Sequence, residues 1–411
     1  MGEARPWIEG AGVAGQAVVV SGLNAHRKRF SSRGLFWLFV LCVLVMAHAV
    51  IYLSIGRVAP RLFNLAWFAA AAASLSASAA APRLSPPRNG TGRISLCSVL
   101  QRCGAFWNIF VLLTAVFTLI TRGAANIIPH SPHASFAVSS SAALAVCLYG
   151  LLEARRVRAV SFRLCTGKLP KGRRLRIAQI SDLHIGPFMN IGHISRIVNM
   201  TLETRADLVA VTGDTVDGAV GGRSGPLPFY APFSKKLKEL ADNAPPLGVW
   251  AVPGNHEHYE DFEGSGRFIE DSGMKLLRGE KADLGPIVIV GADDLDHIEK
   301  DHGDQSRTLS QALVESLSSE ERKKFVLFLR HRPVVEQATV GIFDLQLSGH
   351  THGGQLFPLP SSRHKIPGRP RGLRRLGGGS SLYVSNGSGF VGPPMRFFAP
   401  PEIVVIDLIG E

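Results

Sequence analysis

The stretch IFDLQLSGHTH, residues Ile342 to His352, is an apolar run that stops at a glycine and two histidines. Other runs of the same form occur in the second half of the chain: RLRIAQISDLH, ADLVAVTGD, GVWAVPGNHEH, PIVIVGADD and KFVLFLRHRP. Near-continuous Val, Ile and Leu over this length is typical of strands that are covered on both faces. Helical patterns such as HISRIVNMTLETRA separate these runs, so the sequence predicts a layered α/β domain that begins near Arg173.

Polar residues follow these predicted strands at the points where the strands end. The set contains only carboxylate, amide and imidazole side chains: Asp182, His184, Asp214, Asn255, His256, His331, His350 and His352. A single Asp at such a place usually makes a turn, and a single His is more often structural than a ligand. In open α/β sheets, however, ligands bind beyond the carboxyl ends of the strands. The repetition of these residue types at successive strand ends therefore predicts one shared site.

Oxygen and imidazole ligands without thiolate indicate a metal site for Mn, Fe, Zn or Mg. The candidate ligands are too many for one ion, and they fit two divalent ions about 3.5–4 Å apart that share a carboxylate. Asp214 is the expected bridge, because Gly213 before it lets the backbone come close. Two such cations would make a bridging water acidic and would neutralise phosphate oxygens. The predicted chemistry is in-line attack of a metal-bridging hydroxide on phosphorus, without a protein nucleophile.

The motifs DLH, GD, GNHE, RHRP and GHTH resemble, in order and spacing, the signature of the calcineurin-like metallophosphoesterases. The resemblance covers roughly Arg173 to the C-terminus, and the tail from GHTHGGQ to EIVVIDL resembles a bacterial branch that is often membrane-attached. It implies a metallophosphoesterase-type β-sandwich flanked by helices. It also implies one metal held by Asp182, His184, Asp214 and His352, and a second held by Asp214, Asn255, His331 and His350. By the same resemblance, His256 would be the catalytic acid beside Asp214.

Some of these assignments have alternatives. His256 adjoins a ligand, so it can either enter the site as an acid or orient Asn255. Arg330 stands where many relatives have a small residue, which weakens the assignment of His331. Asp217, in GDTVD, either hydrogen-bonds a ligand or makes a turn, and Glu257 is expected to support the site rather than to bind metal.

The first 155 residues differ in composition from the rest of the chain. They contain long apolar runs that carry no charge until their edges. A helix that crosses a bilayer needs about 20 mostly apolar residues. The sequence predicts a transmembrane region over residues 34–155, with about four spans near 34–56, 62–81, 104–121 and 135–154. The second and fourth are weaker, since they are rich in Ala or Ser, and their alternative is a buried helix in a soluble core.

Arginines indicate how these spans are oriented. The segment before the first span, the loop between the second and third, and the segment after the fourth are rich in Arg, whereas the other two loops are poor. This alternation predicts that both ends are cytoplasmic. The expected order is a cytoplasmic tail over 1–33, the spans, a linker over 156–172 and a cytoplasmic phosphoesterase domain over 173–411. The expected location is a membrane, as a multi-pass protein of the bacterial inner membrane. Loss of one weak span would reverse the side of the domain.

Composition excludes several other classes of protein. The net charge of +13 could suggest nucleic acid, but much of it flanks the apolar runs and no RNA-binding or helix-turn-helix motif occurs, so no nucleic acid is expected. The five cysteines include no CxxC pair and none lies beyond Cys165. A zinc knuckle, a thioredoxin-like site and a disulfide framework are therefore not expected.

Together these patterns predict a membrane-anchored, metal-dependent phosphoric ester hydrolase with membrane lipids as partners. Its substrate would be a phosphomonoester, a phosphodiester or a pyrophosphate, and the membrane attachment favours a lipid-linked one. The main alternative is a non-catalytic ligand-binding or regulatory membrane protein on a phosphoesterase fold. The complete set of metal ligands argues against this alternative, because a protein without catalytic activity would have no reason to keep every ligand. Transport by the spans is disfavoured, because transporting spans usually carry buried charges and these interiors have almost none beyond His48 and Asn64.

Overall fold

The structure, a computed structural model, describes the following residues: 42–53, 96–124, 131–217, 220, 228–243, 245–294, 309–355 and 371–411. It divides the chain into two compact units. One unit comprises Met1–Ser76 and Trp107–Ala143, and the other comprises Ala77–Phe106 and Leu144–Glu411. The two long helices described next run from one unit into the other, and all the strands belong to the second unit.

The long helices are α3 (Leu96–Ala124) and α4 (Pro132–Ala154). Both are long and apolar enough to cross a membrane, with mean hydropathies of 2.1 and 1.7. In each helix, most of the apolar stretch that could cross a membrane is exposed: only 33% of that stretch is buried in α3 and 28% in α4. They cover the predicted spans near 104–121 and 135–154. A shorter apolar helix, Cys42–Leu53, overlaps the first predicted span, whereas the span near 62–81 lies outside the described residues. The predicted bundle of four helices is therefore not confirmed.

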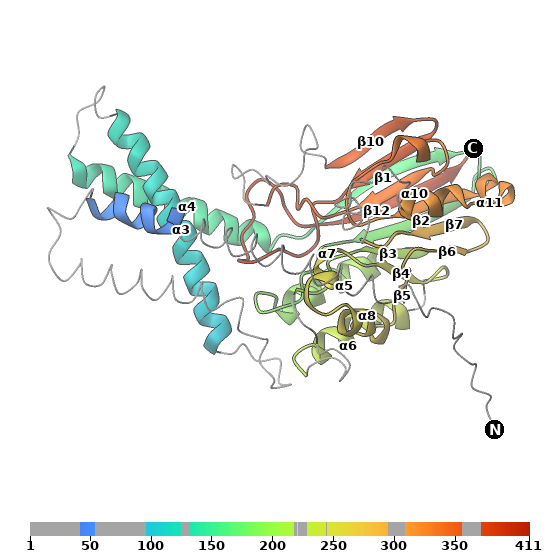
Figure 1. The fold of residues 1–411 in the computed structure, drawn as a ribbon, viewed down its shortest axis with the longest axis horizontal. Coiled ribbons are helices and arrows are strands. Elements are labelled where there is room, and N and C mark those ends of the chain that lie inside the picture. The colour runs from blue at the N-terminus through green and yellow to red at the C-terminus, as the bar shows by residue number, and fades with distance from the viewer. Residues whose placement is uncertain are drawn as a thin grey trace, which may run out of the picture. The chain divides into compact units, whose positions relative to one another are not determined.

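The second unit contains two six-stranded sheets (Figure 1). The first has the order β1-β12-β2-β3-β4-β5. Its strands are β1 (Arg158–Thr166), β2 (Arg174–Ile180), β3 (Leu208–Thr212), β4 (Val249–Val252), β5 (Lys275–Leu276) and β12 (Glu402–Gly410). The second has the order β10-β11-β9-β8-β7-β6. Its strands are β6 (Glu280–Asp283), β7 (Ile287–Gly291), β8 (Phe325–Leu329), β9 (Leu345–Ser348), β10 (Gly372–Gly377) and β11 (Ser380–Val384).

The central strands of each sheet run parallel. In the first sheet β2, β3 and β4 pair in parallel register, and in the second β7, β8 and β9 do the same. Parallel strands end at one edge of their sheet, so the residues that follow them are brought together. These strands of four to seven residues are rich in Val, Ile and Leu and almost wholly buried, as expected for strands covered on both faces.

Apolar layers hold the sheets and helices together. One layer lies between the sheets and includes Ile177 of β2, Leu327 of β8 and Leu345 of β9. A second lies under helices α5 (Ile191–Glu203), α6 (Ala231–Asp242) and α8 (Phe262–Asp271), which cover the other face of the first sheet. A third lies where α10 (Leu309–Glu315) covers β7 and β8. The short helices are α7 (Asn255–Glu260), α11 (Ser319–Lys323) and the 3-10 turn η4 (Gln337–Thr339). The predicted layered α/β domain is thus confirmed.

The residues of strand β3 contribute alternately to two of these apolar layers. Its residues alternate in direction, so Val209 and Val211 face the helices while Leu208 and Ala210 face the second sheet. Helix α5 presents Ile194, Ile197 and Val198 to the first sheet at helical spacing. The side chain of Asn190 caps its beginning by accepting a hydrogen bond from the His193 amide at 2.9 Å.

The segment 156–172 corrects one expected boundary. It was expected to be a linker, but it contains β1, which pairs in parallel with β12 from Arg158 to Thr166. The burial pattern of β1 is mostly exposed, and only Leu164 is buried, which is typical of an edge strand. RAVSFRLCT has no continuous apolar run, and its signal is only the short alternation of apolar and polar residues from Val160 to Leu164. The folded domain therefore begins near Arg158 rather than near Arg173.

Candidate metal centre

The residues that follow the parallel strands adopt an uncommon backbone conformation. Five of the seven non-glycine residues with positive φ in the described chain are predicted ligands: Asp182 (53°), His184 (46°), Asp214 (49°), His350 (70°) and His352 (49°). Each such residue costs on the order of 1 kcal/mol or more, and such strain collects at functional sites. The strain here turns the carboxylates and imidazoles of both sheets toward one place.

Glycines allow these loops to approach each other closely. A Cβ atom on Gly254 would lie 2.2 Å from Oδ1 of Asp214, and a Cβ atom on Gly349 would lie 2.2 Å from Oδ2 of Asp182. Neither distance is possible for real atoms, so only glycine fits at either position. The glycines of GNHE and GHTH are therefore required by the packing of the carboxylates against neighbouring loops.

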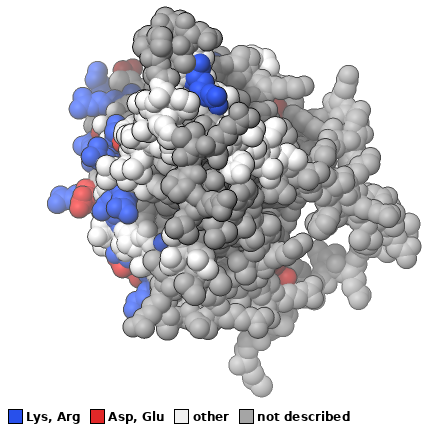
Figure 2. All heavy atoms as spheres, turned by 90° about the vertical axis from the view of Figure 1, so that its left-hand side faces the viewer, with Lys and Arg blue, Asp and Glu red and all other residues white. Residues whose placement is uncertain are grey.

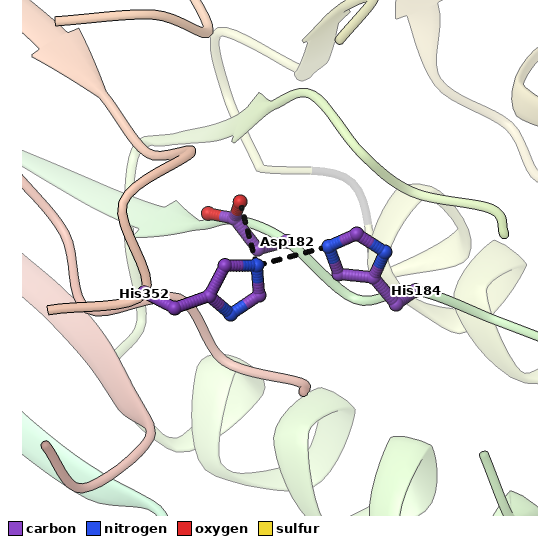
Figure 3. A group of neighbouring side chains, drawn as sticks. All are labelled: Asp182, His184 and His352. Atoms are coloured by element: carbon purple, nitrogen blue, oxygen red, sulfur yellow. Dashed lines mark hydrogen bonds and ion pairs between the residues drawn. The ribbon is translucent and has the colours of Figure 1, made fainter. Parts of the chain in front are cut away.

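Three predicted ligands form one buried group, which combines two loops of the domain (Figure 3). Asp182 and His184 follow β2, and His352 follows β9. The Nε2 atoms of His184 and His352 lie 3.0 Å apart, and Nε2 of His352 lies 3.4 Å from Oδ1 of Asp182. Two imidazole nitrogens and a carboxylate oxygen that converge in this way offer the donor set of a divalent ion.

A second buried group contains Asp214, His331 and His350, from the ends of β3, β8 and β9. Nε2 of His331 lies 3.0 Å from Nδ1 of His350 and 3.1 Å from Oδ2 of Asp214. Nδ1 of His331 lies 2.8 Å from the carbonyl oxygen of Thr212 and donates to it, so Nε2 is the nitrogen that faces the other two members of the group. The Arg330 that precedes His331 points elsewhere and pairs with Glu336 at 2.7 Å.

Asp214 is a member of the second group, and it also faces a residue of the first. Its Oδ2 is 3.1 Å from Nε2 of His331 and 3.6 Å from Nε2 of His184, which belong to different groups. Its Oδ1 accepts a hydrogen bond from the His256 amide at 2.9 Å. One carboxylate oxygen therefore faces the ligands of both groups, as expected for a bridge.

The donor atoms fit divalent metal. Oδ2 of Asp182 and Oδ1 of Asn255 are buried and have no hydrogen-bond partner among the described residues. A buried carboxylate or amide oxygen without a partner is costly, and a cation is what such oxygens bind. Asn255 begins α7 at the end of β4 and is 2% exposed, so it turns inward with the other ligands.

His256 lies beside these groups with a different set of contacts. Its Nδ1 is 2.9 Å from Oδ1 of Asp217, and its ring meets the ring of His184 edge-on at 4.6 Å. The His256 side chain is 22% exposed, unlike His184 and His331. His184, Asp217 and His256 also form a group that could hold a metal ion. The partial exposure of His256 and its contact with Asp217 are typical of an imidazole that can reach a bound substrate.

The protonation of these groups follows from burial and from their neighbours. Burial, with help from His256, lowers the pKa of His184 to about 4, and burial and His184 also lower the pKa of His352. Burial opposes the charge of Asp214, but His331 and His256 outweigh it and hold the pKa of Asp214 well below its usual value. Neutral imidazoles beside an ionised carboxylate are the forms that metal binding requires.

The pKa values of other groups at the site are raised. For His331, burial disfavours the charged ring, but the carboxylate of Asp214 outweighs it and raises the pKa to about 10, so metal binding would have to displace a proton from this ring. Burial raises the pKa of Asp182 to about 6, and the charge of Asp214 adds to this effect. For His256, burial disfavours the charged ring, but the carboxylates of Asp214 and Asp217 outweigh it and raise the pKa to about 9. His256 therefore carries a proton at neutral pH and can donate it.

Glu257 supports the site from beneath. Its buried carboxylate accepts hydrogen bonds from the amides of Asp214, Thr215, Val216 and Gly254, at 2.7–3.1 Å. It thus ties the turn after β4 to the turn after β3. This agrees with the expectation that Glu257 supports rather than binds.

Arg396 is a residue of the site that the sequence patterns do not reveal. This side chain is fully buried and donates to the carbonyl oxygens of Asn386 at 2.8 Å and Ala399 at 2.9 Å, while one guanidinium nitrogen lies 3.4 Å from Nδ1 of His352. Burial lowers its pKa to about 10, so it stays charged at neutral pH. A single Arg in the segment MRFFAPP gives no spacing signal, and only the fold shows that it lies behind His352.

Comparisons with known proteins agree with this site. A family model described as calcineurin-like phosphoesterase matches residues 175–354, which contain all the predicted ligands. An uncharacterized metallophosphoesterase of Aquifex aeolicus is 35% identical over 265 residues, which cover 64% of this chain and 96% of that protein. The chain belongs to the calcineurin-like metallophosphoesterases.

Two further relatives match this chain over only part of their own length. An uncharacterized metallophosphoesterase of Campylobacter jejuni is 33% identical over 58% of this chain and 60% of its own length. A transmembrane protein with a metallophosphoesterase domain from Danio rerio is 30% identical over 64% of this chain and 60% of its own length. The chain therefore spans about 60% of each of these two relatives. Family membership indicates a phosphoesterase that uses divalent metal.

Proposed function

We propose that the protein is a membrane-anchored phosphoesterase that binds two divalent metal ions and hydrolyses a phosphomonoester, phosphodiester or pyrophosphate bond. The observation that carries this proposal is the place of Asp214, whose Oδ2 faces His184 of one ligand group and His331 of the other. Asp182 and His352 would complete the first site, and Asn255 and His350 the second. When bound, the two ions would acidify a water molecule between them and neutralise charge on the phosphoryl oxygens.

The residues of this chain have separate tasks in such a reaction. The carboxylates and imidazoles would hold the ions, and the glycines of the turns let the loops come close enough to do so. His256 is protonated at neutral pH and partly exposed, so it donates a proton to the leaving oxygen or hydrogen-bonds the phosphate. Asp217 fixes the orientation of the His256 ring through Nδ1.

Membrane attachment is the second part of the proposal. Helices α3 and α4 are long and apolar enough to span a bilayer, and the Danio rerio relative is named as a transmembrane protein. The arginines after α4 favour a cytoplasmic phosphoesterase domain on a multi-pass protein of the inner membrane. A lipid-linked phosphate ester is the favoured substrate, because such a site would lie beside the bilayer. Mass spectrometry of lipid extracts incubated with the protein would identify a lipid that disappears.

The metal and the reaction are tested together with one variant. The full-length chain, purified in detergent with Mn²⁺, should hydrolyse bis(4-nitrophenyl) phosphate. Asp214→Asn removes the charge that the two ions would share. The rate of hydrolysis or the affinity for Mn²⁺ should therefore fall by at least about 100-fold. The matched control is Asp271→Asn, an exposed aspartate on α8 that should change neither. Equal activity in Asp214→Asn would contradict the mechanism, and metal binding without hydrolysis would favour the non-catalytic alternative.

A further inference from the structure

The loop from Pro393 to Pro401, which connects the site to β12, exposes a large apolar side chain. Phe398 is 67% exposed, whereas its neighbours Phe397 and Ala399 are buried. Phe398 also has a φ of 57°, in the left-handed region where Asn or Gly is favoured. Part of the Phe398 ring packs within its unit, near Tyr149, and the rest is open to the surroundings of the chain. Such an exposed ring can contact a partner outside the protein.

The same loop is fastened to the end of α4. The Arg396 amide donates to the carbonyl oxygen of Gly150 at 3.0 Å, and a Cβ atom on Gly150 would lie 2.5 Å from the ring of Phe397. The ring of Phe398 lies 5.7 Å from the ring of Tyr149. All of these residues belong to the same compact unit. The exposed aromatic ring is therefore continuous with the surface of an apolar helix.

That helix surface is itself apolar and open. Leu144, Leu148 and Leu152 are 45%, 49% and 52% exposed, and their spacing of four places them on one face of α4. Tyr149 lies between this face and Phe398, and it is 37% exposed. An exposed apolar stripe on a helix of this length suits lipid rather than water.

Basic residues border this surface. Arg155 and Arg156 are exposed directly after α4, and Arg371 is exposed and donates to the Phe398 carbonyl oxygen at 2.9 Å. The segment 387–401 contains no acidic residue. In the view of Figure 2, Lys and Arg stand out over Asp and Glu on the described part of the face shown. An aromatic ring flanked by arginines is the pattern of the boundary between acyl chains and anionic headgroups.

We propose that the Pro393–Pro401 loop is an interfacial anchor that inserts Phe398 into an anionic lipid surface beside the end of α4. The inference rests on the proposed membrane attachment and goes beyond it. The loop also carries Arg396, whose guanidinium lies behind His352, so the anchor fixes the metal site close to the headgroups. A substrate in the bilayer would then reach the site without leaving the lipid surface.

The test measures the depth of single positions in vesicles that contain phosphatidylglycerol. The full-length chain, with its native cysteines replaced, carries one fluorophore-labelled cysteine at Phe398, Leu148 or Glu320. Glu320 lies on α11, and its side chain is 78% exposed. Phospholipids with a spin label near the headgroup end of the acyl chain should quench the label at 398 but not the label at 320. The label at 148, which lies beside Tyr149 on α4, should be quenched as well.

The outcomes separate the two proposals. If the label at 148 is quenched and the label at 398 behaves like that at 320, membrane attachment holds and the interfacial loop is refuted. If neither is quenched, both are refuted, whereas hydrolysis of bis(4-nitrophenyl) phosphate by the unlabelled chain still tests the phosphoesterase alone. Should the labelled protein fail to fold, Phe398→Trp provides a second probe. Its added emission should be quenched by phospholipids brominated on their acyl chains, and an absence of quenching would overturn the inference.

Discussion

At the scale of single residues, left-handed backbone conformations turn the candidate ligands toward one another: Asp182, Asp214 and His350 have φ values of 53°, 49° and 70°. DLH, GD, GNHE, RHRP and GHTH identify their members because each stands at the end of an apolar run. The left-handed backbone of Asp182, Asp214 and His350 has no such signal, since these residue types are common in ordinary conformations. Arg396 was missed for a related reason, because its role depends on contacts between segments far apart in the chain.

The contact between His256 and Asp217 predicts a pH dependence. Asp214 and Asp217 raise the pKa of His256 to about 9 against the effect of burial. An acid catalyst must be protonated, so activity should fall as the pH rises through that value. Asp217→Asn removes one of the charges that raise the pKa, and the alkaline limb of kcat should move to lower pH. Profiles of kcat against pH for bis(4-nitrophenyl) phosphate would show this shift.

The control for that profile is Asp271→Asn, which lies on the exposed surface of α8 and should leave both limbs in place. A uniform decrease in kcat at every pH, with the alkaline limb unmoved, would mean that Asp217 only shapes the loop. The alternative role of His256, orienting Asn255, would give that same uniform result.

At the scale of elements, Glu257 joins the beginning of α7 to the end of β3. Its two oxygens accept four backbone hydrogen bonds, two each, and the side chain is fully buried. In Glu257→Gln an amide group replaces one oxygen and faces two backbone N–H groups that then lack an acceptor. Leaving such donors unsatisfied should lower the free energy of unfolding by about 2 kcal/mol or more. Urea denaturation of the variant measures this loss.

Glu263→Gln is the matched control, because Glu263 lies on the surface of α8, where its side chain is 49% exposed and pairs with Arg267. Its effect should stay within about 0.5 kcal/mol, as is usual for surface changes. Similar losses for both variants would argue against the supporting role of Glu257.

Strands that are buried on both faces are easier to predict than edge strands. Strands β3 and β8 are continuous apolar runs, because helices or the other sheet cover each face. Strand β1 is exposed along most of its length, so it has no such run, and its signal is only the short alternation from Val160 to Leu164. Its pairing with β12, a segment distant in the sequence, cannot be read from that local pattern.

At the scale of the whole molecule, β1 determines where a stable phosphoesterase domain can begin. A fragment that starts at residue 173 loses the parallel pairing with β12 and the buried Leu164. It should be less stable than a fragment that starts at residue 156 by about 3 kcal/mol or more, from lost apolar burial and hydrogen bonds. The bare edge of β12 should also promote aggregation. Thermal denaturation and size-exclusion chromatography of the two fragments compare both properties.

Leu164→Ala in the longer fragment separates the two causes of that loss. It removes the apolar contact but keeps the backbone pairing, so its stability should lie between those of the two fragments. Equal melting temperatures for the fragments that begin at 156 and 173 would show that β1 contributes nothing to the domain.

The last prediction concerns the side of the membrane on which the domain lies. Arg102 near the beginning of α3 donates to the carbonyl oxygens of Pro187 and Met189, and α4 ends at Ala154, just before exposed Arg155 and Arg156. The basic ends of both helices therefore adjoin the phosphoesterase domain, and the positive-inside rule assigns them to the cytoplasm. Ser131, exposed before α4, should lie on the opposite side.

Cysteine labelling tests this arrangement in the full-length chain with its other cysteines replaced. Cys165 is exposed on β1, so a membrane-impermeant maleimide should label it in inverted membrane vesicles but not in sealed right-side-out ones. With Cys165 also replaced, Ser131→Cys should show the reverse pattern. Exchange of the two patterns would put the domain outside the cytoplasm, as expected if the number of spans before α3 were odd. Labelling of both positions from one side would mean that α4 does not cross the bilayer, because its two ends must then share a compartment.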